Sequence, residues 1–224
     1  MSSQEDRITD VDGLVGKLVY SIGQNSVPDM IFKTLLNNMG IKFKVGEQAQ
    51  EGFVTIRYFA NGSEVNSKLL LAKQSGEEVY GVIAEPDVQT GKNAGLYEIF
   101  DLQKLWIAFS KDEFIGYAQA VLIAKSSVCE DSKFVEKLFE ELEKGNEKLL
   151  KDASHAESNI KDIYPQTSLQ DNLNKEVVER CNIELIPMES GRVYYEKTLK
   201  AVMDINANLI GGQLPDDNFY YINK

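Results

Sequence analysis

The spacing of apolar positions predicts two helices at the start of the chain. Residues 9–22 place apolar side chains on one helical stripe, and Gly23 follows as a stop signal. Residues 26–39 repeat this spacing, with Pro28 in the first turn and Gly40 after the last. We therefore expect a helix in each of these two segments.

The next segment changes to the two-residue period of β-strands. Apolar residues alternate with lysines after Gly40, as in a strand with one face in water. Residues 53–60 are β-branched or aromatic on both faces, and Asn61-Gly62 is a strong hairpin signal. We therefore expect an α+β fold in which helices pack on an antiparallel β-meander. Its strands are expected at residues 41–45, 53–60, 68–73 and 79–84.

The C-terminal half has mainly helical patterns. Its expected elements are a loop at 85–94, a short helix at 95–105 with a strand as the alternative, a helix at 131–151, a polar linker at 151–166, and helices at 168–180 and 190–210. Residues 106–125 fit a helix and a strand equally well. We expect an α+β domain over residues 1–151 and a helical extension over residues 152–224, either independent or packed on that domain.

Composition limits the classes of partner and the cellular compartment that we expect. There are 24 Lys and Arg against 35 Asp and Glu, so the net charge is −11 and the pI is about 4.7. This charge repels phosphate backbones and anionic lipids, so neither nucleic-acid binding nor membrane binding is expected. No apolar run is long enough for a membrane span, and the first ten residues lack a signal-peptide core. Two cysteines cannot build a disulfide framework, which favours a cytoplasmic protein.

One acidic segment partly matches a catalytic pattern. Metal-dependent nucleases of the restriction-endonuclease type place Pro-Asp on one strand and Asp/Glu-x-Lys on the next, and the two acids hold Mg²⁺. Here the lysine comes one place too late, so a solvated acidic loop is the simpler interpretation and a magnesium site is the alternative. In the alternative, the catalytic residues are Asp87, Asp101, Gln103 and Lys104, and the metal ligands are Glu85, Asp87, Glu98 and Asp101.

Other candidate chemistry is sparse. His155 is the only histidine, so a multi-histidine metal site cannot form. The sequence contains neither a phosphate-binding glycine loop nor a nucleophile elbow, and no cofactor is expected. The tail carries Phe219, Tyr220 and Tyr221, which either dock on the protein's own core or present a motif to a partner.

Four segments carry a resemblance in topology. They are the helix VPDMIFKTLLNNMG, the strands IKFKV and GFVTIRYF, and the closing helix KFVEKLFEELEKG. If residues 106–123 form strands, the element order over residues 27–151 resembles the type III secretion chaperone-like fold. Small bacterial proteins of the sensory-transduction-regulator family share this fold. The resemblance implies protein binding without catalysis, often by a homodimer.

These observations favour a non-enzymatic, acidic protein-binding protein, such as a chaperone, an inhibitor or an assembly component of a bacterium or a phage. Its expected partner is a protein with a basic surface, and a homo-oligomer is compatible with this interpretation. The aromatic tail is the candidate partner-binding segment. Two alternatives remain open: a Mg²⁺-dependent nuclease or related hydrolase, and a viral structural subunit.

Overall fold

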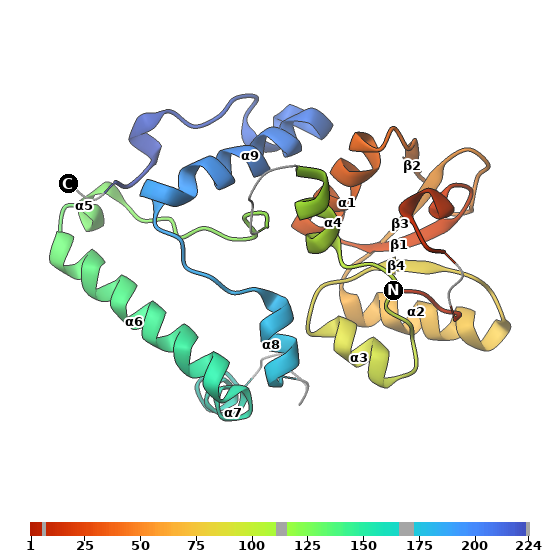
Figure 1. The fold of residues 1–224 in the computed structure, drawn as a ribbon, viewed down its shortest axis with the longest axis horizontal. Helices are drawn as coiled ribbons and strands as arrows, with labels where there is room; N and C mark the ends of the chain where they lie inside the picture. Colours follow the sequence, from red (N-terminus) through yellow and green to blue (C-terminus); the bar gives the residue numbers. More distant parts are fainter. Residues whose placement is uncertain (6–7, 111–115, 166–172, 223–224) are drawn as a thin grey trace. The chain divides into compact units, whose positions relative to one another are not determined.

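The computed structural model describes residues 1–5, 8–110, 116–165 and 173–222, and divides the chain into two compact units. The first unit comprises Met1–Gln119 and Tyr194–Leu214, and the second comprises Ala120–Val193 and Pro215–Lys224 (Figure 1). The chain therefore passes between the units three times.

The first unit is built on a four-stranded sheet whose described strands all pair with one another in parallel. Its strands are β1 (Leu18–Ile22), β2 (Phe43–Val45), β3 (Val54–Phe59) and β4 (Tyr80–Val82), in the order β2-β3-β1-β4. The expected mixture of helices and strands is confirmed, but the expected antiparallel meander is wrong. Parallel strands need crossover connections, and helix α2 (Gly62–Ser75) supplies the one that leads from β3 past β1 to β4.

The hairpin predicted at Asn61-Gly62 is replaced by the start of α2. The Asn61 side chain accepts a hydrogen bond from the Glu64 backbone N–H at 2.9 Å. The Glu64 carboxylate in turn accepts one from the Ala60 N–H at 3.0 Å. These two side-chain caps, a variant of the capping box in which Glu64 bonds to the residue before the N-cap, begin a helix, so the return strand expected over residues 68–73 is helical instead.

The first predicted helix is also wrong. Residues 9–22 form a short 3-10 helix, η1 (Val11–Leu14), followed by the central strand β1. Gly16 lies between them with φ +81°, a left-handed conformation that glycine adopts without a steric penalty. Its N–H donates to the Phe53 carbonyl at 2.9 Å, so the chain turns here into the sheet.

Helices cover both faces of this sheet (Figure 1). Helices α1 (Val27–Asn38) and α4 (Leu102–Ser110) lie on one face, while α2 and α3 (Asp87–Asn93) lie on the other. The helix expected at 26–39 is confirmed as α1. The loop expected at 85–94 contains α3, and the helix expected at 95–105 lies further along the chain as α4.

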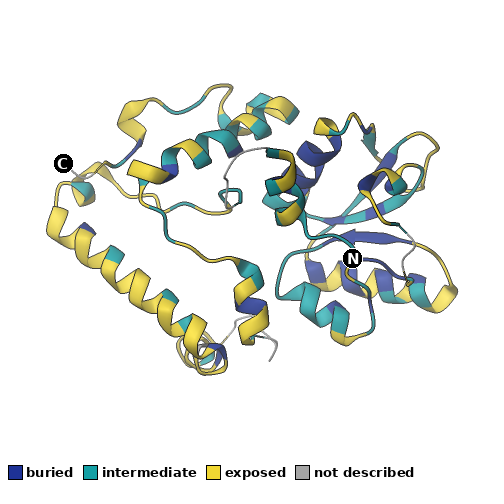
Figure 2. Cartoon of the chain, viewed as in Figure 1, coloured by how far each residue is buried: buried dark blue, intermediate teal, exposed yellow. Residues whose placement is uncertain are grey.

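The core of the first unit has a cluster on each face of the sheet. Phe32 and Leu36 of α1 pack with Val19 and Ile56 of the sheet. On the opposite face, the buried members come from the N-terminus, from α2 and from the segments that follow it, namely Met1, Val65, Leu69, Ala72, Val79 and Leu96. Figure 2 shows the buried residues gathered on the strands and on the helix faces turned toward them.

The first three residues are buried at the β4 edge of the sheet. Ser2 forms antiparallel bridges with Tyr80 and with Tyr97. The Ser3 hydroxyl accepts a hydrogen bond from the Val79 N–H at 2.9 Å and donates one to the Glu77 carbonyl at 2.7 Å. This segment therefore protects the backbone edge of β4.

The second unit is helical in its described part. It contains α5 (Ser126–Cys129), α6 (Ser132–Lys151), α7 (Ala153–Ile163), α8 (Lys175–Cys181) and the start of α9 (Met188–Asn206). The amphipathic helix expected at 131–151 is confirmed as α6, and the last helix as α9 followed by η2 (Ala207–Ile210). The polar linker expected at 151–166 contains α7 instead.

Two expectations fall partly on residues that the structure does not describe. The helix expected at 168–180 is described only from residue 173, and α8 begins at Lys175. Within 106–125, α4 extends to Ser110, residues 111–115 lie outside the described part, and residues 116–125 belong to no strand. A 3-10 turn, η3 (Asp217–Phe219), follows near the C-terminus. No described helix is both long and apolar enough to span a bilayer.

Candidate functional site

The parallel sheet changes its direction of winding between β1 and β3. These strands are neighbours, but α1 follows β1 on one face of the sheet and α2 follows β3 on the other. The Gly23 N–H donates to the Phe59 carbonyl at 2.9 Å, which joins the two strand ends. In open α/β sheets, ligands bind outside the carboxyl ends of the strands at such a switch point.

We call this region the switch-point edge: residues 23–26 after β1, residues 60–61 after β3 and residues 83–86 after β4. Gln24, Asn25 and Asn61 are exposed there. The Asn61 Oδ1 already accepts from the Glu64 N–H, so its NH₂ group is what it offers, whereas Gln24 and Asn25 each carry both a donor and an acceptor.

A buried polar network lies directly beneath the β1–α1 loop. Asp29, in the first turn of α1, is fully buried. Its Oδ2 accepts hydrogen bonds from the Asn25 backbone N–H at 2.8 Å and from Lys33 Nζ at 2.7 Å. Its Oδ1 accepts one from the Tyr58 hydroxyl of β3 at 2.9 Å. One carboxylate thus connects the loop, the helix and the neighbouring strand.

The network satisfies charges that burial would otherwise penalise. The Lys33 side chain is only 7% exposed, and its Nζ also lies 5.3 Å from the centre of the Tyr58 ring. A buried ion pair is stable only when its partners are close and hydrogen-bonded, as they are here. Burial, followed by the nearby Asp29 charge and its hydrogen bond, raises the pKa of the Tyr58 hydroxyl well above its ordinary value. Tyr58 therefore stays a hydrogen-bond donor at neutral pH.

The loop after β4 brings carboxylates to the same end of the sheet. Asp87 starts α3 and lies against the start of α2, since a Cβ on Gly62 would come within 2.2 Å of Asp87 Oδ2. The Asn66 side chain donates to the Asp87 carbonyl at 2.8 Å. Burial raises the pKa of the Asp87 carboxyl, and the nearby charge of Glu85 raises it further.

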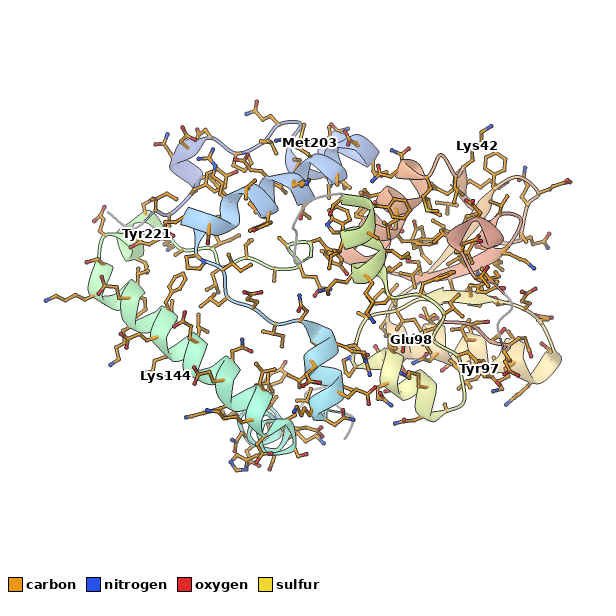
Figure 3. The ribbon with its side chains drawn as sticks, in the orientation of Figure 1. Lys42, Tyr97, Glu98, Lys144, Met203 and Tyr221 are labelled. Atoms are coloured by element: carbon orange, nitrogen blue, oxygen red, sulfur yellow. The ribbon has the colours of Figure 1, made fainter. Side chains whose placement is uncertain are left out.

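The predicted magnesium ligands fall into separate local roles. Glu98 pairs with Lys92 at 2.8 Å. The Asp101 carboxylate caps α4 by accepting from the N–H groups of Gln103 at 3.0 Å and Lys104 at 3.2 Å, and Lys104 Nζ lies 3.3 Å from it. Figure 3 labels Glu98 in the segment that leads from α3 toward α4.

Among the described residues, no group of three or more His, Cys, Asp or Glu side chains is arranged to hold a metal ion. The structure places Asp87 near Glu85, and Asp101 with Gln103 and Lys104. The Mg²⁺-dependent nuclease therefore stays a prediction, and the described residues show no metal centre that supports it.

The aromatic tail is held against the start of α9 within the second unit. Arg192 pairs with Asp217 at 2.7 Å and lies 4.1 Å above the Tyr220 ring, which is buried. Phe219 contacts that ring edge-on at 5.4 Å and is itself 49% exposed. Tyr220 is thus part of the fold, and partner binding by Phe219 and Tyr221 stays a prediction.

Sequence reasoning missed the residues of the network. Asp29 and Lys33 are spaced four apart in a run that is otherwise apolar, Met30 to Leu36 with Thr34, which is the one signal the sequence offered. A charged pair of that kind within a buried helix face indicates that each residue compensates the other. The partners Asn25 and Tyr58 become visible only with the parallel pairing of β1 and β3.

Comparisons with known proteins give a likeness of fold. No protein-family model matches the chain, and no curated protein matches it significantly. A solved structure from Parabacteroides distasonis, described as an ABC transporter, is similar with a TM-score of 0.71 and 18% sequence identity. The alignment covers 93% of this chain and 67% of that one. At this identity the likeness concerns the fold, which extends over nearly the whole chain.

Proposed function

We propose that this protein binds a small solute at the switch-point edge. The observation that carries the proposal is the divergence of α1 and α2 to opposite faces from the neighbouring strands β1 and β3. That arrangement leaves loop backbone and side chains at the carboxyl ends of the strands, where α/β proteins bind ligands. The exposed amides of Gln24, Asn25 and Asn61 supply hydrogen-bonding groups there.

The similar structure described as an ABC transporter supports the same class of function. ABC transporters move solutes, so a solute-recognising protein of such a system is the role that we propose for this chain. Function resides in the site that a fold carries, and here that site is formed by the residues of the switch-point edge.

A screen for stabilising solutes tests this proposal. We would measure the melting temperature with a panel of amino acids, sugars, amines and small organic acids, and then titrate each stabilising compound by calorimetry. A ligand that binds only the folded state raises the melting temperature with its concentration. The absence of any stabilising solute from such a panel would count against the proposal.

A matched pair of variants locates the site. Asn25→Gly removes the amide while keeping a residue suited to φ +67°, and Asn182→Gly does the same at φ +48° on the C-cap of α8 in the second unit. Losing one hydrogen bond to a solute should weaken binding about tenfold. We expect this loss in Asn25→Gly and unchanged affinity in Asn182→Gly. Equal affinities would place the solute elsewhere.

Protein binding remains a second candidate, and one surface favours it. On α6, Phe134, Leu138 and Leu142 follow one another at four-residue spacing and are 51%, 38% and 37% exposed. Apolar side chains gathered in this way are typical of a protein contact. A pull-down washed at low and high salt, with Leu138→Lys beside the natural sequence, tests it. Retention at high salt that Leu138→Lys abolishes would implicate this surface, whereas loss at high salt would implicate the acidic one.

A further inference from the structure

The β1–α1 loop contains a residue in an uncommon backbone conformation. Asn25 has φ +67°, in the left-handed region that residues other than glycine adopt infrequently. Asparagine tolerates this region better than most residues, but a single conformation still has to be selected. The hydrogen bond from the Asn25 N–H to Asp29 Oδ2, at 2.8 Å, makes that selection.

The Asp29 carboxylate can hold the loop only if it is itself held. The Tyr58 hydroxyl donates to Oδ1 of this carboxylate. Lys33 Nζ and the Asn25 N–H both donate to Oδ2. With both oxygens engaged by donors from different elements, the carboxylate has one orientation, and that orientation points Oδ2 at the loop. Removing any one donor releases part of this constraint.

Tyr58 links this helix–loop arrangement to the opposite side of the switch point. It belongs to β3, where it pairs with Ser21 of β1, and the next residue, Phe59, accepts the hydrogen bond from Gly23. The network holds Asn25, and the separate Gly23–Phe59 bond holds residue 23, so together they fix the loop relative to the strand that leads to Asn61. Fixing both sides of a site before binding lowers the entropy that a ligand has to overcome.

We infer that Asp29, Lys33 and Tyr58 are positioning residues, which hold the Gln24–Asn25 loop in its ligand-ready conformation at the switch-point edge. The functional meaning of this inference rests on the proposed solute site. The positioning of the loop can be measured without any solute. The positioning role and the solute site can therefore be disproved separately.

Amide hydrogen exchange of the ligand-free protein tests the inference. Tyr58→Phe removes the hydroxyl with almost no change in volume. The neighbouring Gly23 amide bonds to Phe59 and not to Asp29, so it reports on general loosening at the same place. We expect exchange at the Asn25 amide to accelerate about tenfold, the effect of one lost hydrogen bond, and exchange at Gly23 to stay unchanged.

Tyr80→Phe is the matched control. Tyr80 is a buried tyrosine of the neighbouring strand β4, and its hydroxyl donates to Glu78 rather than to Asp29. It should leave Asn25 exchange as it is in the natural sequence. Unchanged Asn25 exchange in Tyr58→Phe would overturn the inference. Equal acceleration of Gly23 and Asn25 would overturn it as well, because Tyr58 would then serve general stability alone.

A solute found by the screen supplies the second readout. Tyr58 does not belong to the exposed set at the edge, so Tyr58→Phe should weaken binding about as much as it loosens Asn25, roughly tenfold, while Tyr80→Phe binds normally. Accelerated Asn25 exchange with unchanged affinity for a solute that Asn25→Gly weakens would overturn the positioning role and leave the solute site standing.

Discussion

The Tyr58 hydroxyl donates a hydrogen bond to the Asp29 carboxylate at 2.9 Å, across 29 residues of sequence. The bond ties the first turn of α1 to β3, at the point where the winding of the sheet changes direction. Because the same carboxylate receives the Asn25 N–H, the packing of α1 against the sheet and the shape of the β1–α1 loop depend on one group. A change to the Asp29 carboxylate should therefore affect both the packing of α1 and the conformation of the β1–α1 loop.

The first prediction concerns the titration of Tyr58. Burial raises its pKa, and the Asp29 charge and hydrogen bond raise it further. Replacing Asp29 by Asn removes the charge, so the pKa should fall toward its ordinary value while remaining above it through burial. Ultraviolet or NMR titration of the phenol measures this. Glu64→Gln, which removes an exposed carboxylate that caps α2, should not move it. An unchanged pKa in Asp29→Asn would contradict the assignment.

The second prediction concerns the buried ion pair. Lys33→Met leaves the Asp29 carboxylate buried without its cation, which should lower the free energy of unfolding by about 3–5 kcal/mol. Combining Lys33→Met with Asp29→Asn removes the unpaired charge and should restore part of the lost stability. Urea denaturation measures both variants.

Lys144→Met is the control for this pair. Lys144 also pairs with a carboxylate, Glu141, but in an exposed position on α6 (Figure 3). Since water solvates an exposed charge, this variant should unfold like the natural sequence. If the double variant of Lys33→Met with Asp29→Asn were as unstable as Lys33→Met alone, the unpaired Asp29 charge would not be the cause of the lost stability.

The fold shows why some elements follow from the sequence and one central strand does not. Helix α6 has one apolar face, so its 3.6-residue period is visible, and α1 is marked by Pro28 in its first turn and by Gly40 after its end. Strand β1 is covered by helices on both faces, as central strands of parallel sheets are, and therefore shows no alternation. Because β1 carries apolar residues on both of its faces, its sequence fits a helical stripe equally well.

The antiparallel expectation failed twice. The strands around residues 43–45 and 54–59 pair in parallel, and Asn61-Gly62 begins a helix where a hairpin was expected. Asn-Gly favours a two-residue hairpin, but asparagine is also among the best residues at a helix N-cap. The decisive residue is Glu64, three places later, which supplies the second cap. Reading Asn61 together with Glu64 would have predicted the start of α2, and with it the crossover that makes β3 and β4 parallel.

The candidate site was less accessible to sequence reasoning than the helices. Acidic residues near 85–101 were visible, but the structure uses Asp101 as a cap and pairs Glu98 with Lys92. The network at the switch-point edge needs residues from a loop, a helix and a strand. Only the Asp29–Lys33 spacing was local enough to be seen beforehand.

The third prediction concerns the pH dependence at Asp87. Its pKa is raised in the folded protein, through burial and then through the charge of Glu85, above its ordinary value of 3.8. The folded state therefore binds this proton more tightly than the unfolded state, so the ionised form costs stability at neutral pH. Asp87→Asn should stabilise the protein at neutral pH.

The gain in Asp87→Asn should have a definite pH window. It should shrink as pH falls through the folded pKa and vanish below 3.8, where Asp87 is protonated in both states. Melting temperatures of the two proteins across this range measure the difference. Asp216→Asn, at an exposed position near the C-terminus, supplies a comparison. A difference between natural and Asp87→Asn proteins that grew as pH fell would give the shift the opposite sign.

The last prediction separates two glycines by what lies beside them. At Gly62 a new Cβ would lie 2.2 Å from Asp87 Oδ2 and 2.7 Å from the Asp87 Cβ, closer than atoms can approach, so Asp87 and the start of α3 must shift. Gly62→Ala should therefore lower the free energy of unfolding by about 1–3 kcal/mol.

At Gly145, in the middle of α6, a Cβ meets nothing within 4 Å, and alanine is the better helix former. Gly145→Ala should raise the free energy of unfolding by about 0.5–1 kcal/mol. Urea denaturation distinguishes the two, and Gly62→Ala combined with Asp87→Ala should recover stability, because the second change removes the atoms that the first one meets. A Gly62→Ala protein as stable as the natural one would mean that α3 does not press on the start of α2, and that the loop after β4 is set by contacts other than Asp87.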